Sequence, residues 1–470
     1  MSQAEIGVVG LGVMGAALAR NFHSRGRTVA VYNRRADVLA DFLAAHGDDR
    51  FLGSGEYAAF VGALARPRKI VLMVTAGPAV DAVIDALEPH LDEGDIIVDG
   101  GNSHYDDTER RLERAAAAPW RFIGMGVSGG EEGARLGPAM MPGGDESAWE
   151  AVRPLLEEAA AVSDTGPCVG WCGSGSAGHF VKMVHNGIEY GDMQLITEAH
   201  DLLRRGLGRS PAQARDTFTR WNDGPLSSFL VEITAGIVAA KDPQGDGPLL
   251  DQILDRAGQK GTGRWTAIAA IEAGVPLSTI VSAVDARVLS ALKPLRAEAE
   301  SVFPAGAAPL DRISEDDIEA ALYAAKLLSY TQGFALLRQA SDDRGYNVDL
   351  AGVARIWKAG CIIRAAFLDD VHTAFSEAPD LPLLMLAPAF QVELVPRLLP
   401  WRRVVAAATI AGIPVPALSA SLAWFDTVTR YEGTANLIQA QRDWFGAHTY
   451  RRIEAPDVPV HTDWGSLEQL

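Results

Sequence analysis

The segment GHFVKMVHNGIEY, residues 178–190, combines an amine, an imidazole, an amide and a carboxyl group in a pattern that could serve catalysis. Four polar side chains recur in it, with the last three at offsets of three, four and seven residues from the first: Lys182, His185, Asn186 and Glu189. On a helix of 3.6 residues per turn these positions share one face. A lysine desolvated among Val and Met can have its pKa lowered toward ~7 to 8 and act as a general base. A buried structural ion-pair network is the alternative that this segment leaves open.

Lys182 and Glu189 would stand two helical turns apart, roughly 10 Å along the axis, which leaves room for a small substrate between them. Such a base and acid need a helix to carry them and a second domain to bring an electron acceptor close. The rest of the sequence supplies candidates for both.

A glycine-rich turn near the N-terminus has the pattern that binds dinucleotides. GLGVMG places Gly10, Gly12 and Gly15 between the strand-like IGVV and the helix-like AALARNF. In such a turn the first glycine permits the tight bend, the second lets a pyrophosphate approach the backbone, and the third allows close helix packing. The helix N-terminus then faces the phosphates.

The end of the next strand bears on which dinucleotide would bind. An NAD site places Asp or Glu there to hold the ribose 2′-hydroxyl, whereas VAVYN ends in Asn33, Arg34 and Arg35. Guanidinium groups can pair with a 2′-phosphate, so the sequence predicts NADP. Asp37 lies near enough to leave NAD open, and a solvated loop is the other interpretation.

Two further turns follow strand-like runs, at the edge where open α/β sheets bind ligands. DGGNS carries Asn102, and GVSGG carries Ser128, Gly129 and Gly130. Their small residues would let a substrate approach backbone amides. Each turn alone is equally typical of an ordinary loop.

A third loop, QKGTGRW, carries Lys260 and Thr262, and Arg287 follows it in the chain. Lysine, threonine and freed amides suit a phosphate or carboxylate group. A solvent-exposed loop is an equal alternative.

Composition narrows the class of protein. The formal net charge of −18 argues against sequence-independent binding of nucleic acid. No apolar run approaches the ~20 residues that cross a bilayer, and the first residues lack the pattern of a signal peptide. The three cysteines form no disulfide framework and no metal motif. These features predict a soluble cytoplasmic protein with no membrane span and no metal site.

The 470 residues exceed the size of one hydrophobic core. The first part alternates strand-like runs (IGVVG, TVAVYN, KIVLMV, DIIVDG and RFIGMG) with helix-like segments, which predicts a parallel α/β sheet. We expect three parts: a Rossmann-type α/β dinucleotide-binding domain (1–176), a large all-α domain (177–434) and a C-terminal tail (435–470). The aromatic tail would dock in cis or on a partner subunit.

A faint repeat runs through the helical part. The string VKMVHNGIEY is similar to AKLLSYTQGF, with Lys182 matching Lys326. In the second string, Gly333 occupies the position that corresponds to Glu189. A duplication in which the first copy alone kept the acid is one interpretation. Chance similarity between two apolar helices is the other.

Together these strings resemble the 6-phosphogluconate dehydrogenases, decarboxylating enzymes of the pentose phosphate pathway that also serve gluconate utilization. The resemblance runs nearly end to end through GLGVMG, VYNRR, DGGNS, GVSGGEEGARLGPAMMPGG, GHFVKMVHNGIEYGDMQ, ILDRAGQKGTGRW, IWKAGCIIR and RDWFGAHTY. It implies a homodimer whose tail reaches the partner. It also implies oxidation of 6-phosphogluconate at C3 by NADP, loss of C1 as carbon dioxide, and release of ribulose 5-phosphate.

The resemblance assigns a role to each candidate residue. Lys182 would be the base at the C3 hydroxyl, and Glu189 the acid that protonates C1 of the enediol. The substrate contacts would be Asn102, Ser128, Gly129, Gly130, His185, Asn186, Tyr190, Lys260, Thr262 and Arg287, with Arg442 and His448 supplied by the other subunit. The cofactor contacts would be Gly10, Gly12, Val13, Met14, Gly15, Asn33, Arg34, Arg35, Val74 and Asn102.

The chain departs from the family where the common string NRT is replaced by Asn33, Arg34 and Arg35, which bears on the strength of the NADP preference. Two other functions stay open. A β-hydroxyacid dehydrogenase would share the glycine turn and the lysine without decarboxylation, and a nucleotide-sensing protein would keep the fold without the chemistry. The QKGTGRW loop and the RDWFGAH string count against the β-hydroxyacid dehydrogenase, and Lys182 and Glu189 count against the nucleotide-sensing protein.

Overall fold

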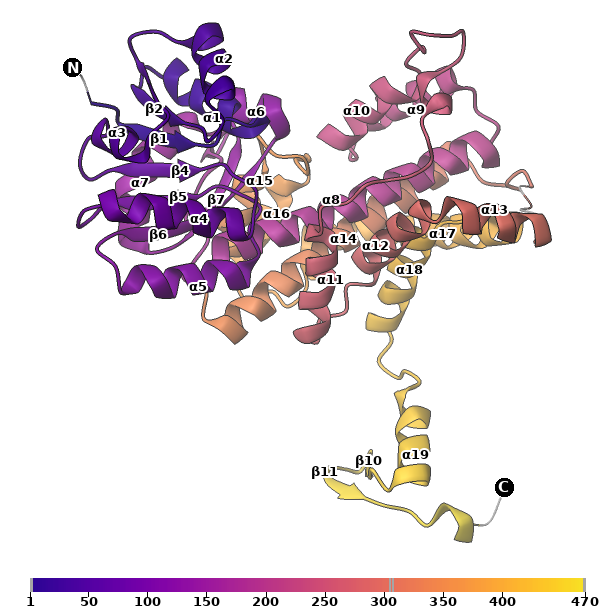
Figure 1. The fold of residues 1–470 in the computed structure, drawn as a ribbon. Coiled ribbons are helices and arrows are strands. Elements are labelled where there is room, and N and C mark those ends of the chain that lie inside the picture. Colours follow the sequence, from indigo (N-terminus) through magenta and orange to yellow (C-terminus); the bar gives the residue numbers. More distant parts are fainter. Residues whose placement is uncertain (1–2, 304–305, 307, 468–470) are drawn as a thin grey trace. The chain divides into compact units, whose positions relative to one another are not determined.

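The computed structural model describes residues 3–303, 306 and 308–467. They form two units, residues 1–421 and 422–470 (Figure 1). The first unit contains a seven-stranded sheet followed by a long series of helices, and the second contains the tail.

The sheet has the strand order β3-β2-β1-β4-β5-β6-β7. Its strands are β1 (Ile6–Val9), β2 (Val29–Tyr32), β3 (Phe51–Ser54), β4 (Lys69–Leu72), β5 (Ile96–Asp99), β6 (Arg121–Ser128) and β7 (Ala139–Gly144). The five predicted strands are confirmed as β1, β2, β4, β5 and β6. The prediction of a purely parallel sheet is wrong at one edge, because β7 runs antiparallel to β6.

The strands β3 and β7 escaped prediction because their sequences, FLGS and AMMPGG, contain glycine and proline, which are rare in strands. Backbone pairing supports them instead. Residues 51–54 pair with β2, and residues 139–144 pair with β6.

Helices cover both faces of the sheet. They are α1 (Val13–Ser24), α2 (Ala36–His46), α3 (Tyr57–Gly62), α4 (Pro78–Leu87), α5 (Tyr105–Ala116), α6 (Gly130–Leu136) and α7 (Glu146–Ala159), with a 3-10 turn η1 (Glu88–His90). A short hairpin, β8 (Val162–Ser163) and β9 (Gly166–Pro167), follows.

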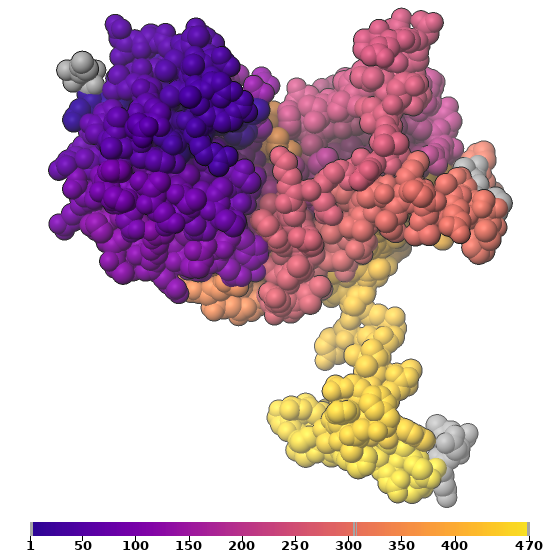
Figure 2. Space-filling model, viewed as in Figure 1, coloured from indigo at the N-terminus to yellow at the C-terminus, as the bar shows by residue number. Residues whose placement is uncertain are grey.

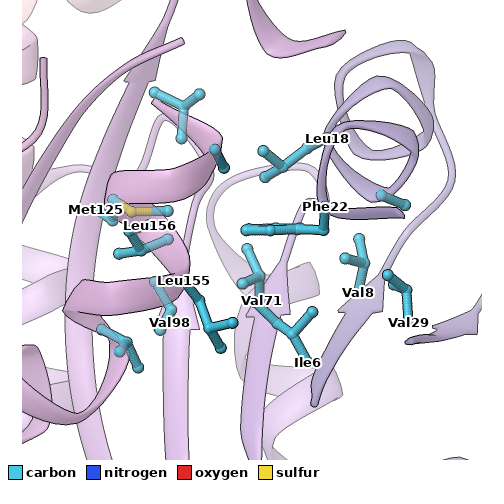
Figure 3. Packing of buried hydrophobic residues seen from close by; sticks show 14 of the residues in the cluster. Ile6, Val8, Leu18, Phe22, Val29, Val71, Val98, Met125, Leu155 and Leu156 are labelled. Atoms are coloured by element: carbon cyan, nitrogen blue, oxygen red, sulfur yellow. The ribbon is translucent and has the colours of Figure 1, made fainter. Parts of the chain in front are cut away.

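Two apolar clusters form the core, one on each face. Val8 and Val71 point to one face with Phe22 (Figure 3), whereas Val9 and Leu72 point to the other. Strands covered on both faces must be apolar at successive positions, which explains runs such as KIVL. In Figure 2 the side chains of this domain, coloured indigo to purple, fill one continuous body.

The part predicted to be all-α, residues 177–434, is largely helical among its described residues. The elements are α8 (Ala177–Asp201), a π turn η2 (Leu202–Gly206), α9 (Pro211–Asn222), α10 (Phe229–Val238), η3 (Leu249–Gln252), α11 (Thr262–Glu272), α12 (Ser278–Ala291), α13 (Lys293–Val302), α14 (Glu315–Arg344), α15 (Leu350–Trp357), α16 (Leu368–Glu377), η4 (Leu384–Leu386), α17 (Pro388–Ala411) and α18 (Pro416–Val428). Ser210 and Ser314 each form a capping box at the start of α9 and α14.

Helices α8 and α14 pack against each other and are buried on nearly all sides. A helix that is apolar all round belongs in the interior of a domain. Polar side chains on these two helices are therefore exceptions that require partners.

The tail unit contains α19 (Ala435–Gly446), a hairpin of β10 (Tyr450–Arg452) and β11 (Ala455–Val460), and a 3-10 turn η5 (Trp464–Ser466). The buried Asp443 carboxylate accepts hydrogen bonds from the backbone of Thr449 and Thr462 and from the Trp464 indole, at 2.8, 3.1 and 2.9 Å. These contacts fold the tail around one carboxylate.

Candidate active site

Helix α8 carries the four candidate catalytic residues, Lys182, His185, Asn186 and Glu189, and the sheet packs directly against this helix. Lys182 is 6% exposed and His185 is fully buried, whereas the Glu189 side chain keeps 23% of its surface open. Gly126 in β6 makes this contact possible, because a Cβ added there would overlap the Cβ of Lys182. The amine is therefore set against the strand end where ligands bind in open sheets.

His185 lies at the centre of a short hydrogen-bonded chain. Its Nδ1 lies 3.1 Å from Asn186 Oδ1, and its Nε2 lies 3.2 Å from Ser128 Oγ. A neutral imidazole that donates from Nδ1 and accepts the Ser128 hydroxyl proton satisfies both contacts. Burial and the charge of Lys182 lower the pKa of His185 well below its usual value, which agrees with a neutral ring.

The Asn186 amide extends this chain to another helix. Its Nδ2 donates to Thr262 Oγ1 in α11 at 3.2 Å. Thr266, one turn later, donates to the carbonyl of Met183 at 2.8 Å and fits against Gly187. The two threonines therefore fix α11 beside the polar face of α8.

The Lys182 amine lies 3.5 Å from His185 Nδ1. Burial lowers its pKa, and the Glu189 carboxyl and the Cys361 thiol act in the opposite direction. An amine in this setting loses its proton more easily than one in water, as a general base requires.

Glu189 has the opposite shift. Burial raises the pKa of its carboxyl, the charges of Lys182 and Arg287 lower it, and Asp192 raises it. The net direction is upward, so this carboxyl keeps its proton to higher pH than an ordinary glutamate. A base and an acid with shifted pKa values on one helix face are typical of a proton-transfer site.

An aromatic ring and a guanidinium flank Glu189. The Arg287 guanidinium from α12 stacks on the Tyr190 ring, with its carbon 3.7 Å from the ring centroid. Gly263 in α11 packs against the same ring, where a Cβ would collide with it. Lys260 is exposed in the preceding loop. This group of residues, Tyr190, Thr262 and Arg287, offers hydroxyls and a cation for an anionic group.

The loop after β6 brings backbone amides to the same place. Gly129 and Gly130 have φ angles of 115° and 64°, which favour glycine. Gly129 also packs against the carbonyl of Gly360, so a side chain has no room there. The structure thus brings Ser128 and the start of α6 next to His185.

The glycine turn has the geometry that its pattern predicts. Gly10 has φ 98°, and a Cβ on Gly15 would collide with the carbonyl of Gly10. Around Gly12 no atom lies within 4 Å of an added Cβ, so the N-terminus of α1 stays open to a ligand. A hollow of 560 Å³ adjoins it, lined by residues that include Gly12, Val13 and Arg20. Open amides at a helix N-terminus fit a dinucleotide pyrophosphate.

The first residue after β2 contacts this turn. Asn33 Oδ1 accepts a hydrogen bond from the Leu11 amide at 3.0 Å, which fixes the turn to the strand end. Arg35 pairs with Asp37, and both side chains are more than half exposed. Arg34 is exposed beside them. Among the other predicted cofactor contacts, Val74 lies against Gly10, and Met14 packs on the core of the sheet.

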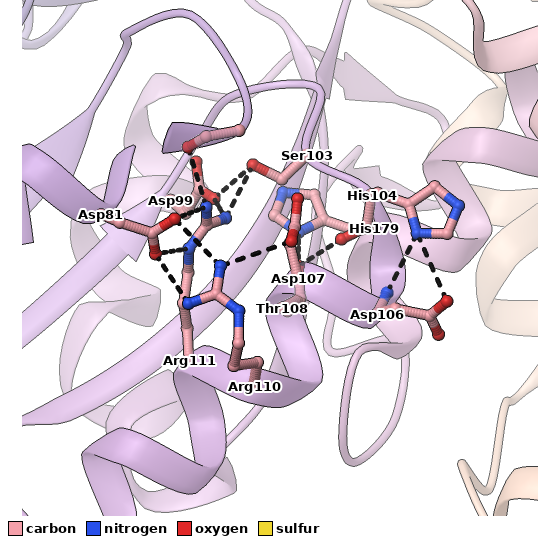
Figure 4. A network of polar contacts seen from close by, with 11 residues as sticks. Asp81, Asp99, Ser103, His104, Asp106, Asp107, Thr108, Arg110, Arg111 and His179 are labelled. Atoms are coloured by element: carbon pink, nitrogen blue, oxygen red, sulfur yellow. Dashed lines mark hydrogen bonds and ion pairs between the residues drawn. The ribbon is translucent and has the colours of Figure 1, made fainter. Parts of the chain in front are cut away.

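Asn102 is exposed in the loop after β5, and a buried polar network that the sequence did not predict holds this loop (Figure 4). Ser103 Oγ donates to Asp99 Oδ2 at 2.6 Å. The Arg111 guanidinium, fully buried, contacts Asp99, Ser103 and Asp81, at 3.3, 3.2 and 2.9 Å. Arg111 stands among several arginines of an otherwise charged helix, so no sequence signal distinguishes it.

The two tail candidates lie in the second unit. Arg442 Nη1 donates to Gln439 Oε1 at 3.0 Å, and the His448 ring lies 6.0 Å from the Phe445 ring. In the described ranges, no helix has the length and apolarity to cross a membrane. Across those same residues, no group of three or more His, Cys, Asp or Glu side chains is placed to hold a metal ion.

Comparison with known proteins places this geometry in a family. Residues 5–173 match the model of the NAD binding domain of 6-phosphogluconate dehydrogenase, and residues 178–464 match its C-terminal domain. A protein of Treponema pallidum named 6-phosphogluconate dehydrogenase, decarboxylating, is 51% identical over 98% of this chain and 97% of its own length. A Synechocystis protein of the same name is 50% identical over 99% and 98%.

A solved structure agrees. The 6-phosphogluconate dehydrogenase of Plasmodium falciparum, determined in its apo form and in complexes with NADP+ and with 6-phosphogluconate, superposes with a TM-score of 0.94. It is 42% identical and covers 98% of this chain and 100% of its own. The chain belongs to the 6-phosphogluconate dehydrogenase family.

Proposed function

We propose that this protein oxidises and decarboxylates 6-phosphogluconate to ribulose 5-phosphate and carbon dioxide, with NADP as the oxidant. The observation that carries the proposal is the buried Lys182 amine beside the neutral His185, with the Glu189 carboxyl on the same helix face. Family membership and the ligands of the Plasmodium relative support the choice of substrate and cofactor.

Lys182 acts first, as the base that removes the proton of the C3 hydroxyl. The open glycine turn at Gly12 would hold NADP, which would supply the acceptor for the hydride of C3. Burial lowers the pKa of the amine, which favours the unprotonated form that this step needs. Ser128 and His185, 3.2 Å apart, hold the hydroxyl groups near the reacting carbons.

Decarboxylation follows from the oxidation product, a β-keto acid. Lys182 now carries the proton and stabilises the negative charge that develops on the C3 oxygen. Asn102 and the amides of Gly129 and Gly130 orient the departing carboxylate. Glu189, which holds its proton because its pKa is raised, protonates C1 of the enediol.

The far end of the substrate is its phosphate. The proposed phosphate subsite consists of Arg287, Tyr190 and Thr262. Lys260, in the loop before α11, would add a second cation to it. Guanidinium and hydroxyl groups are suited to phosphate oxygens.

The partner subunit completes the site in a homodimer, with Arg442 and His448 of the tail. Large apolar side chains of α19 support this assembly, since Leu437, Trp444 and Phe445 are 64, 62 and 72% exposed. The reaction is assigned to the cytoplasm, in keeping with the buried free thiols of Cys168, Cys172 and Cys361.

Oxidation without decarboxylation is the alternative, and one assay separates the two. Purified protein is given 6-phosphogluconate with NADP or NAD, and reduced cofactor and trapped carbon dioxide are both measured. We expect equal amounts of each, formed faster with NADP. Reduced cofactor without carbon dioxide would establish the alternative, and no reduction with either cofactor would refute the proposal.

A further inference from the structure

We propose that Asp192, with its counter-ion Lys326, is a positioning residue for Glu189: the buried carboxylate keeps the Glu189 carboxyl protonated until C1 needs the proton. This inference rests on the role of Glu189 proposed above. Asp192 touches none of the reacting atoms and acts through Glu189.

Asp192 stands three residues after Glu189 on α8, about one turn along the helix. Its side chain is fully buried, and its Oδ2 forms an ion pair with Lys326, which reaches it from α14 and is 1% exposed. The Tyr330 hydroxyl lies 3.3 Å from the same oxygen and 2.6 Å from the carbonyl of Ile363. The pair is thus enclosed between the catalytic helix and its neighbour.

This arrangement is not what stability alone favours. A buried ion pair loses much hydration energy, and apolar side chains of similar size often replace it without loss. Moreover, Asp192 Oδ1 is buried with no hydrogen-bond partner among the described residues. A carboxylate kept at this place with one oxygen unsatisfied calls for a reason other than packing.

The charges that face Glu189 supply the reason. His185 on α8 contacts the Glu189 carboxyl. The other groups that act on it electrostatically are Lys182 and Asp192 from α8, Arg287 from α12 and the Tyr330 hydroxyl from α14. His185 is neutral, and burial raises the pKa of Tyr330 well above its usual value, so that this group is neutral as well.

The charges that remain are the Arg287 cation, the cation that Lys182 becomes once protonated, and the Asp192 anion. Lys182 and Arg287 favour the ionised form of Glu189, and Asp192 opposes them. Lys182 also becomes protonated when it acts as the base. The positive charge that favours ionisation of Glu189 is therefore greatest just before Glu189 must donate its proton. Asp192 offsets this positive charge. Burial gives the pKa of Asp192 a net upward shift, and the adjacent charge of Lys326 acts against that shift and favours the ionised form of Asp192.

The test is the pH dependence of kcat. Glu189→Gln is measured first, because it must abolish or strongly depress the basic limb of the profile if Glu189 is the acid. Asp192→Asn then removes the anion. Lys326 is left either charged or neutral, and in each case the pKa of Glu189 falls relative to that in the parent protein. We expect the basic limb to move to lower pH by about 0.5 to 1 unit, a three- to tenfold change in the ionisation constant.

A double variant, in which both charges of the buried pair are removed, tests the same prediction if the single variant folds poorly. Asp192→Asn with Lys326→Met has no uncompensated charge, and its basic limb should lie between those of the single variant and the parent protein. NADP binding, measured by fluorescence titration, should be unchanged in all three variants and reports an intact fold.

Two results overturn different claims. If Glu189→Gln leaves the basic limb intact, the role of Glu189 as the acid is wrong. If Glu189→Gln removes the limb, whereas neither Asp192 variant moves it, Asp192 only joins the two helices and this inference is wrong.

Discussion

The Lys182 amine lies 3.5 Å from Nδ1 of a histidine, His185, that stays neutral because it is buried. A protonated histidine at this distance would repel the ammonium form of Lys182 and compete for the same proton. A neutral ring can instead orient the amine, and Lys182 is then the group of the pair that can take up the substrate proton. In the proposed mechanism the pair would therefore separate positioning, assigned to His185, from proton transfer, assigned to Lys182.

Lys182→Ala should reduce kcat by about 10²- to 10⁴-fold, the usual contribution of a general base. NADP binding should be nearly unchanged. Lys182→Arg should be equally inactive, since a guanidinium stays protonated. The parent protein should also lose activity as pH falls, because protonation removes the base, with a midpoint below the ordinary lysine value of 10.5. Lys241→Ala, at a 72% exposed lysine, is the control, and turnover of Lys182→Ala close to that of this control would contradict the assignment.

Gly126→Ala should displace the base without touching its chemistry. The new Cβ overlaps Cβ of Lys182, an atom next to the backbone that has little freedom to move. We expect a loss of stability of about 1 to 3 kcal/mol and a larger fall in kcat than in substrate affinity. Gly62→Ala is the matched control, because its Cβ would enter open space on a helix. Equal kinetics of the two variants would show that this contact does not position Lys182.

Asp37→Asn should strengthen binding of NADP and leave that of NAD almost unchanged. Asp37 pairs with Arg35, so part of the positive charge at the strand end is neutralised. Because the pair is exposed and screened, we expect an effect of only about threefold. Dissociation constants are measured for both cofactors. Asp41→Asn, the same charge change one turn further on α2, is the control, and an equal effect of both variants would contradict a specific role of the pair.

Arg111→Met should destabilise the protein by about 3 to 5 kcal/mol, because it leaves the buried Asp99 carboxylate without its cation. Arg110→Met should cost no more than about 1 kcal/mol. Arg110 binds the same Asp81 and differs in being 54% exposed. Urea unfolding curves compare the two variants. Equal shifts would show that the buried network around the Asn102 loop is not a stabilising element.

The tail should lose stability in acid. Hydrogen bonds hold the pKa of the Asp443 carboxyl at about 2, below the ordinary value of 3.8. A depressed pKa gives a contribution that is fully present above about pH 4 and lost as the pH falls toward 2. Hydrogen exchange of residues 443–464 should therefore quicken, relative to its intrinsic rate, over this range. Asp443→Asn should quicken it already at pH 7, whereas Asp457→Asn, on β11, should not; equal behaviour of both variants would contradict the role of Asp443.

The sequence predicts those parts of the site that local chemistry determines. Gly10 and Gly15 are recognised because a tight turn and a close contact leave room for no other residue. The spacing of Lys182, His185, Asn186 and Glu189 is recognised because a helix of known period turns spacing into direction.

Parts that depend on distant pairing escape such reasoning. Strand β7 contains Pro142 and three residues of low strand propensity, and only its partner β6 makes it a strand. Asp192 and Lys326 stand far apart in the chain, and nothing near either residue indicates that they meet. The same holds for Arg111 and Asp99, whose contact depends on how α5 packs on β5.

The carboxylate of Asp443 also bears on how the end of the chain acquires its structure. Its hydrogen-bond partners lie 6 to 21 residues further along, so the loops that must close are short and cost little conformational entropy. In the sheet, by contrast, Gly7 must find Ile70, with β2 and β3 formed between them. Local contacts form faster than distant ones. The tail therefore needs only a short conformational search, whereas the sheet needs segments far apart in the chain to meet.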